Sequence, residues 1–161
     1  MGSAKIIDWI FDKNDIIDNF EQKHFFLSNF YPVEIVYNGK VYPSTEHAYQ
    51  ATKTFVESES EAIRTAETPA RAKKLGKVAT KREDWNEVKI NVMKDLLRIK
   101  FDIPELRDAL LNTYPSKLVE GNWWGDKFWG VCENVGENNL GKLLMDIRDE
   151  IRSTNIPHIL T

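Results

Sequence analysis

The sequence predicts an α+β fold that is mainly helical and carries short antiparallel strands. Apolar residues recur at helical spacing along most of the chain, and one strong hairpin signal occurs at Asn38-Gly39. Strands and long helices do not alternate, which disfavours a parallel βαβ sheet. No glycine-rich phosphate loop is present, so the simplest nucleotide-binding motifs are excluded.

The hairpin is predicted by residues 33–37 and 40–42, because Asn-Gly is the favoured pair for a two-residue type I′ turn. A helix then follows. Ser44 is its expected N-cap, Glu46 lies in its first turn, and the helix is expected to reach Lys53. Residues 5–20 mix isoleucines with aspartates, and their element type stays open.

Helices are predicted over residues 58–67, 69–75 and 83–101, followed by a helix with an apolar face at Leu106 and Leu110. Gly76 is expected just after the second of these helices, as its C′ residue. Short strands are predicted over residues 117–119 and 128–132, on either side of a tryptophan-rich loop. Asn138-Asn139 is expected to cap a final amphipathic helix.

One domain spanning residues 1–161 is expected, because no repeat, linker or low-complexity tract divides the chain. A lone cysteine, Cys132, permits no internal disulfide and fits a reducing compartment. No run of about 18 apolar residues and no signal-peptide core occur, so we expect a cytoplasmic protein with no membrane partner.

The net charge of −3, from 22 Lys and Arg against 25 Asp and Glu, argues against a general grip on nucleic-acid backbone. One local group of cations leaves a nucleic-acid contact open, with a solvated helix face as the alternative. Its members are Arg71, Lys73, Lys74, Lys77, Lys81 and Arg82.

Metal and nucleophile motifs are missing, since the histidines at 24, 47 and 158 are scattered and no CxxC, HExxH or GxSxG occurs. Glu46 and His47 are neighbours on a helix and point about 100° apart, so they do not face one ligand. We therefore expect neither a metal nor a cofactor.

The chemistry that remains is acid–base catalysis by carboxyl groups beside aromatic rings. Glu46, Gln50 and Lys53 share a helix face by their spacing, although a capping acid on a solvated face has the same pattern. Ser28-Asn29 interrupts the apolar run 25–32, which taken alone favours a buried turn. Trp85 opens the helix 83–101, where a core aromatic is the ordinary expectation.

The loop 120–130 holds three tryptophans, three glycines and two acids. Indole faces near Asp126 are expected to desolvate its carboxyl group and suit it to acid–base chemistry. An aromatic cluster that only anchors the loop is the alternative. Rings, amides and acids together suit a pocket for a heterocycle joined to a sugar, an inference that sugar-binding modules share.

Taken together, the motifs resemble the NADAR family of YbiA-like domains over roughly residues 20–152. They are FFLSNFYP (25–32), YPSTEHAYQATK (42–53), KREDWNEVKINVMKDLLRIKF (81–101), LVEGNWWGDKFWGV (118–131) and NNLGKLLMDIR (138–148). The resemblance implies a YbiA-like fold and an N-glycosidase that releases a base from a phosphorylated ribose. Family members act on riboflavin-pathway ribosylamino-pyrimidine phosphates or remove ADP-ribose from guanine in nucleic acid.

The resemblance also implies the site. Glu46, Trp85 and Asp126 match its principal positions and are intact, whereas the region before residue 20 and the pair Asn122-Trp123 are less well matched. Further residues are expected to line the cleft or bind phosphate: Asn29, Lys53, Arg82, Glu120 and Trp129.

Glu46 and Asp126 are the expected catalytic pair in a metal-free hydrolysis, with either acid as the general base. Trp85 would stack on the base, and Lys53 or Arg82 would pair with phosphate. Two alternatives stay open, namely covalent attack by Lys53 on the sugar carbon and a non-catalytic ADP-ribose-binding module.

Overall fold

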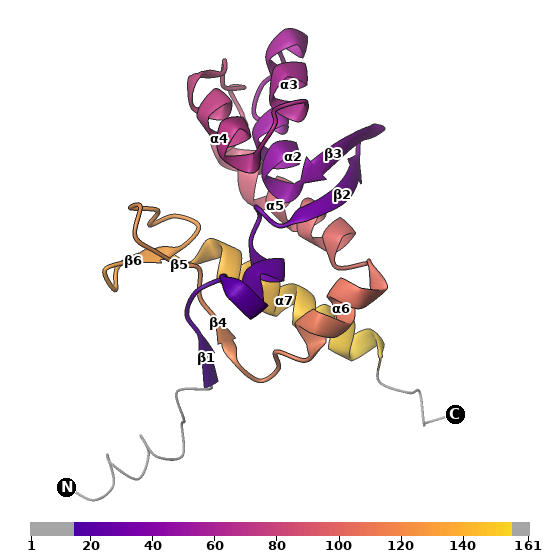
Figure 1. Ribbon diagram of the computed structural model, residues 1–161, viewed down its shortest axis with the longest axis vertical. Coiled ribbons are helices and arrows are strands. Elements are labelled where there is room, and N and C mark those ends of the chain that lie inside the picture. The colour runs from indigo at the N-terminus through magenta and orange to yellow at the C-terminus, as the bar shows by residue number, and fades with distance from the viewer. Residues whose placement is uncertain (1–14, 156–161) are drawn as a thin grey trace, which may run out of the picture. The chain divides into compact units, whose positions relative to one another are not determined.

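The computed structural model describes residues 15–155 (Figure 1). The chain divides into two compact units. The hairpin unit is Phe25–Asp108, and the loop unit joins the segment up to His24 with the segment from Ala109 onward. The expected single domain over 1–161 stays a prediction. Most of the ambiguous segment 5–20 lies outside the described residues.

The predicted hairpin is confirmed in the hairpin unit. Strand β2 (Pro32–Tyr37) pairs antiparallel with β3 (Lys40–Ser44), and Tyr37 lies opposite Lys40. Asn38 and Gly39 form the turn with φ values of 50° and 78°, the left-handed conformations that a type I′ turn requires. The turn chemistry is local, so sequence predicted it well.

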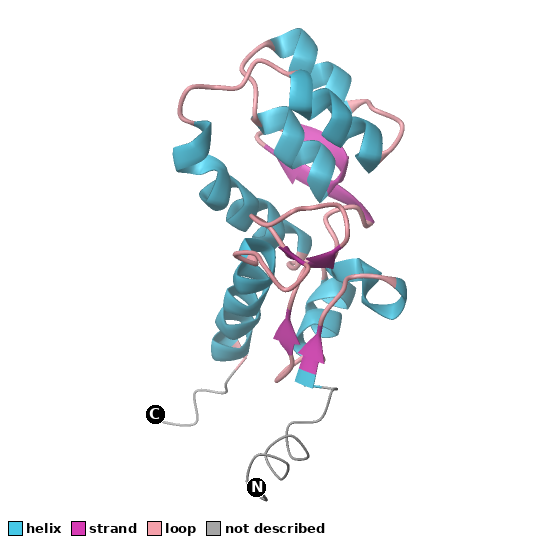
Figure 2. Cartoon of the chain, turned by 90° about the vertical axis from the view of Figure 1, so that its left-hand side faces the viewer, coloured by secondary structure: helices cyan, strands magenta, loops and turns pink. Residues whose placement is uncertain are grey.

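Helix α2 (Thr45–Thr52) begins where the hairpin ends, and Ser44 caps it as predicted. The Ser44 hydroxyl accepts the His47 N–H at 3.1 Å. All residues from Thr45 to Ala51 are buried, because the hairpin and the next helices pack around α2. Figure 2 shows the strands lying against this group of helices.

The next helices are α3 (Glu57–Arg64), α4 (Pro69–Val78), α5 (Trp85–Lys100) and α6 (Pro104–Leu111). The prediction that Gly76 ends the second of these was wrong, because Gly76 lies inside α4. A Cβ at Gly76 would lie 1.9 Å from the Gln50 side-chain oxygen. The glycine therefore serves close packing of α4 on α2 rather than termination.

In the loop unit the strand pairings differ from prediction. β1 (Ile16–Ile17) pairs with β4 (Lys117–Leu118), and β5 (Gly121–Asn122) pairs with β6 (Val131–Cys132). Both pairs are parallel, and the predicted strand 128–132 is confined to Val131–Cys132. Short antiparallel strands are thus confirmed only for the hairpin, because both strand pairs of the loop unit run parallel.

Helix α7 (Asn139–Thr154) completes the loop unit and packs on β4, where Gly141 lies close to the Leu118 carbonyl. The 3-10 helix η2 (Gln22–Leu27) had no sequence signal. Of the helices within residues 15–155, none is both long and apolar enough to cross a bilayer. Helices with short strands make this an α+β protein, as predicted.

His47 is a buried structural histidine on α2, only 1% exposed. Its Nε2 lies 3.0 Å from the Ala66 carbonyl, which only accepts, so Nε2 carries the proton. Its Nδ1, 2.6 Å from the Ser44 Oγ, then accepts from that hydroxyl. Burial lowers the pKa of His47 below 6.5, against a smaller opposing effect of the Ala66 hydrogen bond.

The neutral form of His47 is therefore the native one. Because the folded pKa lies below the unfolded value of 6.5, this stabilisation is complete above about pH 6.5 and declines as pH falls. We expect the free energy of unfolding, measured by urea denaturation, to decrease from pH 7.5 to pH 5.5. His47→Gln should lose about 1–3 kcal/mol at pH 7.5 and flatten this dependence.

The matched control is His24→Gln, at a partly exposed histidine whose pKa is also lowered, first by burial and then by Lys23. This variant should keep most of the pH dependence. An unchanged slope in His47→Gln would contradict the role assigned to His47.

Candidate active site

The sequence-predicted site residues fall into two groups, one in each compact unit. The hairpin unit holds Asn29, Glu46, Lys53, Arg82 and Trp85, and the loop unit holds Glu120, Asp126 and Trp129. Each group is built from its own elements.

Glu46 is a buried carboxyl group, 7% exposed, in the first turn of α2. Its Oε1 accepts the Gln50 side-chain amide at 2.9 Å, one helical turn later. Its backbone N–H donates to the Asn29 carbonyl at 3.0 Å, which ties the first turn of α2 to the Ser28-Asn29 segment. A buried acid at a helix N-terminus, held on both sides, is not a solvated capping residue.

The predicted shared face of α2 is confirmed by hydrogen bonds. The Gln50 side-chain N–H donates to the Glu46 carboxyl group. The Gln50 Oε1 lies 3.5 Å from the Lys53 Nζ. The close approach of Gly76 leaves the Gln50 amide little room to move. An acid and an amide of α2 and the cation of its C-cap residue, one position short of the predicted helix end, therefore lie in a row.

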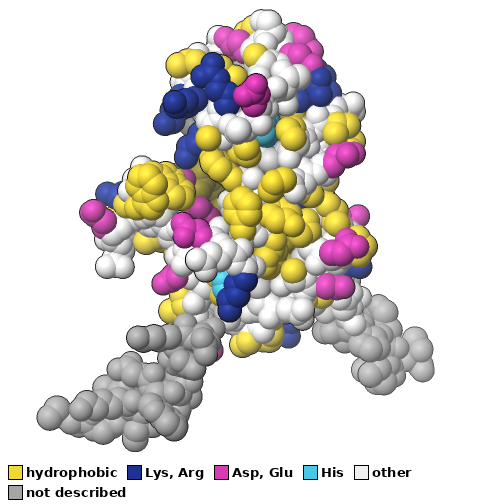
Figure 3. Space-filling model, viewed as in Figure 1, with side chains coloured by type: hydrophobic (Ala, Val, Ile, Leu, Met, Phe, Trp, Pro, Cys, Tyr) yellow, Lys and Arg dark blue, Asp and Glu magenta, His cyan; other side chains and the backbone are white. Residues whose placement is uncertain are grey.

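Lys53 is partly exposed and lies in a cationic neighbourhood. Burial lowers its pKa, Lys81 lowers it next, and the Glu46 carboxylate opposes that shift. Lys89 and Lys77 lower it further. Figure 3 shows Lys and Arg side chains gathered over α4. The positive charges around Lys53 thus favour the binding of an anion. Burial and these charges also make the Lys53 ammonium group lose its proton more readily than usual.

Arg82 is already engaged. Its guanidinium binds the Asp84 carboxylate through Nε at 2.5 Å and a second nitrogen at 2.8 Å, and stacks 4.3 Å from the Phe55 ring centre. Its backbone N–H donates to the Lys53 carbonyl at 2.9 Å, directly after the end of α2. Arg82 consequently anchors the segment that carries Lys53.

Trp85 is 2% exposed, and its ring lies 5.0 Å from the Tyr49 ring at a tilt of 50°. The contact joins the start of α5 to the middle of α2, in agreement with the core-aromatic alternative. A stacking role toward a substrate base stays a prediction.

Two buried polar atoms next to Glu46 lack a hydrogen-bond partner among residues 15–155: Asn29 Oδ1 and Thr45 Oγ1. Asn29 is 8% exposed and Thr45 is fully buried. Buried polar atoms are normally paired, so each exception calls for a partner such as a bound water, an ion or a ligand. Thr45 was missed by sequence reasoning, because a threonine at the start of a helix is ordinary.

Asp126 is half-buried and organises its own loop. Its Oδ1 accepts the backbone N–H groups of Phe128 at 3.1 Å and Trp129 at 2.9 Å. Its backbone N–H and carbonyl bind the Asn122 side chain, at 2.9 Å and 2.8 Å. The carboxyl group is therefore oriented by backbone hydrogen bonds, and Oδ1 is the oxygen that makes them.

Glu120 and Trp129 are joined to this loop through their backbones. The Glu120 carbonyl accepts the Val131 N–H at 2.8 Å, and the Trp129 carbonyl accepts the Leu140 N–H at 3.0 Å. The Trp129 ring packs edge-on against Phe128 at 4.8 Å. Asn122, which matches the family motifs less well, holds the loop together, because its side-chain amide also donates to the Glu120 carbonyl at 3.3 Å.

Trp123 and Trp124 lie edge to face at 5.7 Å and are 83% and 46% exposed. Figure 3 shows hydrophobic side chains gathered on the surface over the segment between β5 and β6. Both rings therefore lie at the surface of the loop, and the expectation that the loop indoles desolvate Asp126 stays a prediction.

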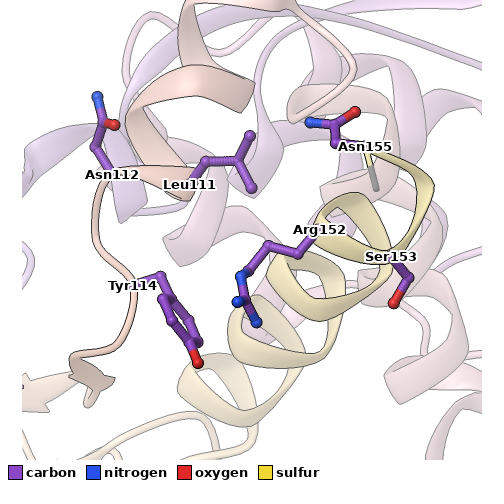
Figure 4. A pocket seen from close by; sticks show the side chains of 6 residues that line it. All are labelled: Leu111, Asn112, Tyr114, Arg152, Ser153 and Asn155. Atoms are coloured by element: carbon purple, nitrogen blue, oxygen red, sulfur yellow. The ribbon is translucent and has the colours of Figure 1, made fainter. Parts of the chain in front are cut away.

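Two surface cavities lie apart from the predicted residues. One, of about 460 Å³, is lined by Tyr114, Arg152 and neighbours in the loop unit (Figure 4). The other, of about 610 Å³, lies beside the hairpin at Glu34, Tyr42 and Arg64. Over residues 15–155, no group of three or more His, Cys, Asp or Glu side chains is arranged to hold a metal ion.

Comparison with known proteins identifies relatives. The chain is 41% identical over 128 residues to the N-glycosidase YbiA of Escherichia coli K12, covering 77% of this chain and 79% of that protein. It is 41% identical over 134 residues to the N-glycosidase Npun_R5314 of Nostoc punctiforme, covering 78% and 85%. It is also 36% identical to the riboflavin biosynthesis protein VVA0006 of Vibrio vulnificus, covering 82% of this chain and 37% of that longer protein.

The NMR structure of E. coli YbiA aligns with a TM-score of 0.78 at 36% identity, covering 91% of this chain and 92% of that one. The model of the NADAR domain matches residues 13–152, beginning somewhat before the motifs do. The chain therefore belongs to the NADAR family, and its N-glycosidase relatives show that it is a glycosyl hydrolase.

Proposed function

We propose that this protein hydrolyses the C1′–N bond between a phosphorylated ribose, or an ADP-ribose, and a nucleobase-like heterocycle. The observation that carries the proposal is the buried Glu46 carboxyl group, fixed by Gln50 and lying near the Lys53 cation. An oriented acid can take a proton from water, and a neighbouring cation suits a phosphorylated substrate.

In the proposed reaction, a water oxygen attacks C1′ and its proton passes to Glu46 or Asp126. The C1′–N bond breaks, and its electron pair leaves with the heterocycle nitrogen, which takes up a proton. The other acid stabilises the positive charge that develops on the sugar. Asn29 Oδ1, buried and without a partner among residues 15–155, would accept a substrate hydroxyl.

Among substrates, we favour a free ribosylamino-pyrimidine phosphate. The similarity to the riboflavin biosynthesis protein of Vibrio vulnificus and the net charge of −3 support this choice. The cations gathered over α4 support a second candidate, ADP-ribosylated guanine in nucleic acid. Either substrate would be cleaved at the same type of bond.

The decisive assay incubates the protein in parallel with the ribosylamino-pyrimidine phosphate, ADP-ribosylated guanine DNA and NAD, and scores the released sugar by mass spectrometry. Release from the first substrate alone would support our choice. Release from the DNA alone would replace it with the second candidate. Tight binding without release from any substrate would instead support a non-catalytic binding module.

Glu46→Gln and Asp126→Asn should each lower kcat by about 10²–10⁴, because each removes a carboxylate from the reaction. Asn at 126 keeps an Oδ1 acceptor for the Phe128 and Trp129 amides, so the loop should stay folded. Glu87→Gln, at an exposed acid of α5, is the matched control and should leave turnover unchanged. Near-normal turnover in both test variants would refute the catalytic pair.

Lys53 carries a second mechanistic possibility, because its lowered pKa leaves more neutral amine at pH 7 than an ordinary lysine has. In that route Nζ attacks C1′, the heterocycle leaves with the bonding electrons, and water later releases the sugar. The acid–base route predicts no adduct after borohydride treatment of the enzyme with substrate. It also predicts that Lys53→Arg retains most turnover while Lys53→Met raises KM, through the lost cation.

A sugar adduct on Lys53, detected by peptide mass spectrometry, would overturn the acid–base route. Lys74→Met is the matched control, since it removes an exposed cation of α4 that is not among the charges that shift the pKa of Lys53.

A further inference from the structure

Lys100 is a fully buried cation at the last residue of α5, with 0% of its surface exposed. Its Nζ donates to the Ser28 carbonyl at 2.8 Å and lies 5.5 Å from the Tyr31 ring centre and 5.2 Å from that of Phe101. Burying an ammonium group is costly unless its hydrogen bonds are made inside the protein. A buried ammonium group that donates to a backbone carbonyl therefore holds that carbonyl in place.

Lys100 binds a tight turn. The Ser28 carbonyl also accepts the Tyr31 N–H at 3.1 Å, and the Ser28 hydroxyl accepts the Phe30 N–H at 3.1 Å. The turn that begins at Ser28 is thus closed by its own hydrogen bonds and held from outside by the Lys100 ammonium group.

The next carbonyl along the chain belongs to Asn29 and accepts the Glu46 N–H at 3.0 Å. The carbonyl that Lys100 holds and the carbonyl that holds Glu46 therefore belong to adjacent residues. The same residue, Asn29, carries the buried Oδ1 that has no partner among residues 15–155. A displacement of the turn would move both the Glu46 backbone and the Asn29 side chain.

We propose that Lys100 is a positioning residue for Glu46, acting through the Ser28-Asn29 carbonyls. This inference rests on the proposed catalytic role of Glu46. Lys100 does not touch the substrate, and its contribution is the placement of a carboxyl group for which errors of about 1 Å reduce rates about 10²-fold.

The test compares Lys100→Met, which keeps the apolar stem, with Lys100→Arg, which keeps a buried cation and its donors. Steady-state kinetics are measured on a substrate that the wild type cleaves, at a temperature where circular dichroism shows each variant folded. We expect Lys100→Met to lower kcat about 10- to 100-fold with KM changed less than about threefold. Lys100→Arg should stay within about threefold of wild type, and Arg98→Met, at an exposed cation of the same helix, should not change.

A double-mutant cycle separates positioning from general stability. In a Glu46→Gln background, Lys100→Met should lower kcat no further, because its effect passes through Glu46, while its effect on Tm should persist. In Lys100→Met alone, hydrogen exchange should quicken at the Glu46 amide relative to the Lys53 amide, which donates to the Gln50 carbonyl at 3.2 Å. Equal reductions of kcat in both backgrounds, or unchanged exchange at Glu46, would overturn the proposal.

Two further outcomes are distinguishable. If Glu46→Gln itself turns over normally, the proposed catalytic role of Glu46 fails although the hydrolase activity stands, and the exchange measurement still decides whether Lys100 holds the Glu46 backbone. If Lys100→Met does not fold, Lys100→Gln replaces it. The shorter neutral amide should lose the hydrogen bond to the Ser28 carbonyl, which the arginine in Lys100→Arg should keep. Equal kcat values for Lys100→Gln and Lys100→Arg would then overturn the positioning role.

Discussion

Helix α2 is buried along nearly all of its length, although it carries a carboxyl group, an imidazole and an amide. Each of these groups must find a partner inside the protein, because an unpaired buried polar group costs folding free energy. Glu46 is paired with Gln50, and His47 is held between Ser44 and Ala66. These bonds fix the orientation of the helix, and the rest of the hairpin unit packs around it.

The same constraint explains the neighbouring elements. Gly76 lets α4 approach the Gln50 amide closely, and Trp85 brings the start of α5 against Tyr49. At its other end, α5 places Lys100 on the turn whose next carbonyl holds Glu46. The candidate acid is thus supported from both ends of one long helix, an arrangement that favours a rigid carboxyl group over a mobile one.

The loop unit obeys a different rule, in which side chains of Asn and Asp replace regular secondary structure. The Asn122 side chain donates to the Asp126 and Val131 carbonyls. The Asp126 carboxyl group accepts the Trp129 backbone N–H. The Asn138 side chain likewise accepts the Glu120 backbone N–H and donates to the Leu118 carbonyl. Backbone groups in a loop with few strand residues are satisfied in this way. The Trp123 and Trp124 side chains remain exposed on this loop.

The sequence alone determined what depends on short-range chemistry. Asn38-Gly39 defined the hairpin, Ser44 defined the start of α2, and the i, i+4, i+7 spacing put Glu46, Gln50 and Lys53 on one face, because φ preferences and helical periodicity are local. Motif order also identified the family. Tertiary structure decided what depends on distant partners. It made Gly76 a packing residue, paired Ile16 with Lys117 in parallel, and buried the Lys100 side chain at the end of α5. Burial and strand pairing are set by residues many positions away, and no local pattern encodes them.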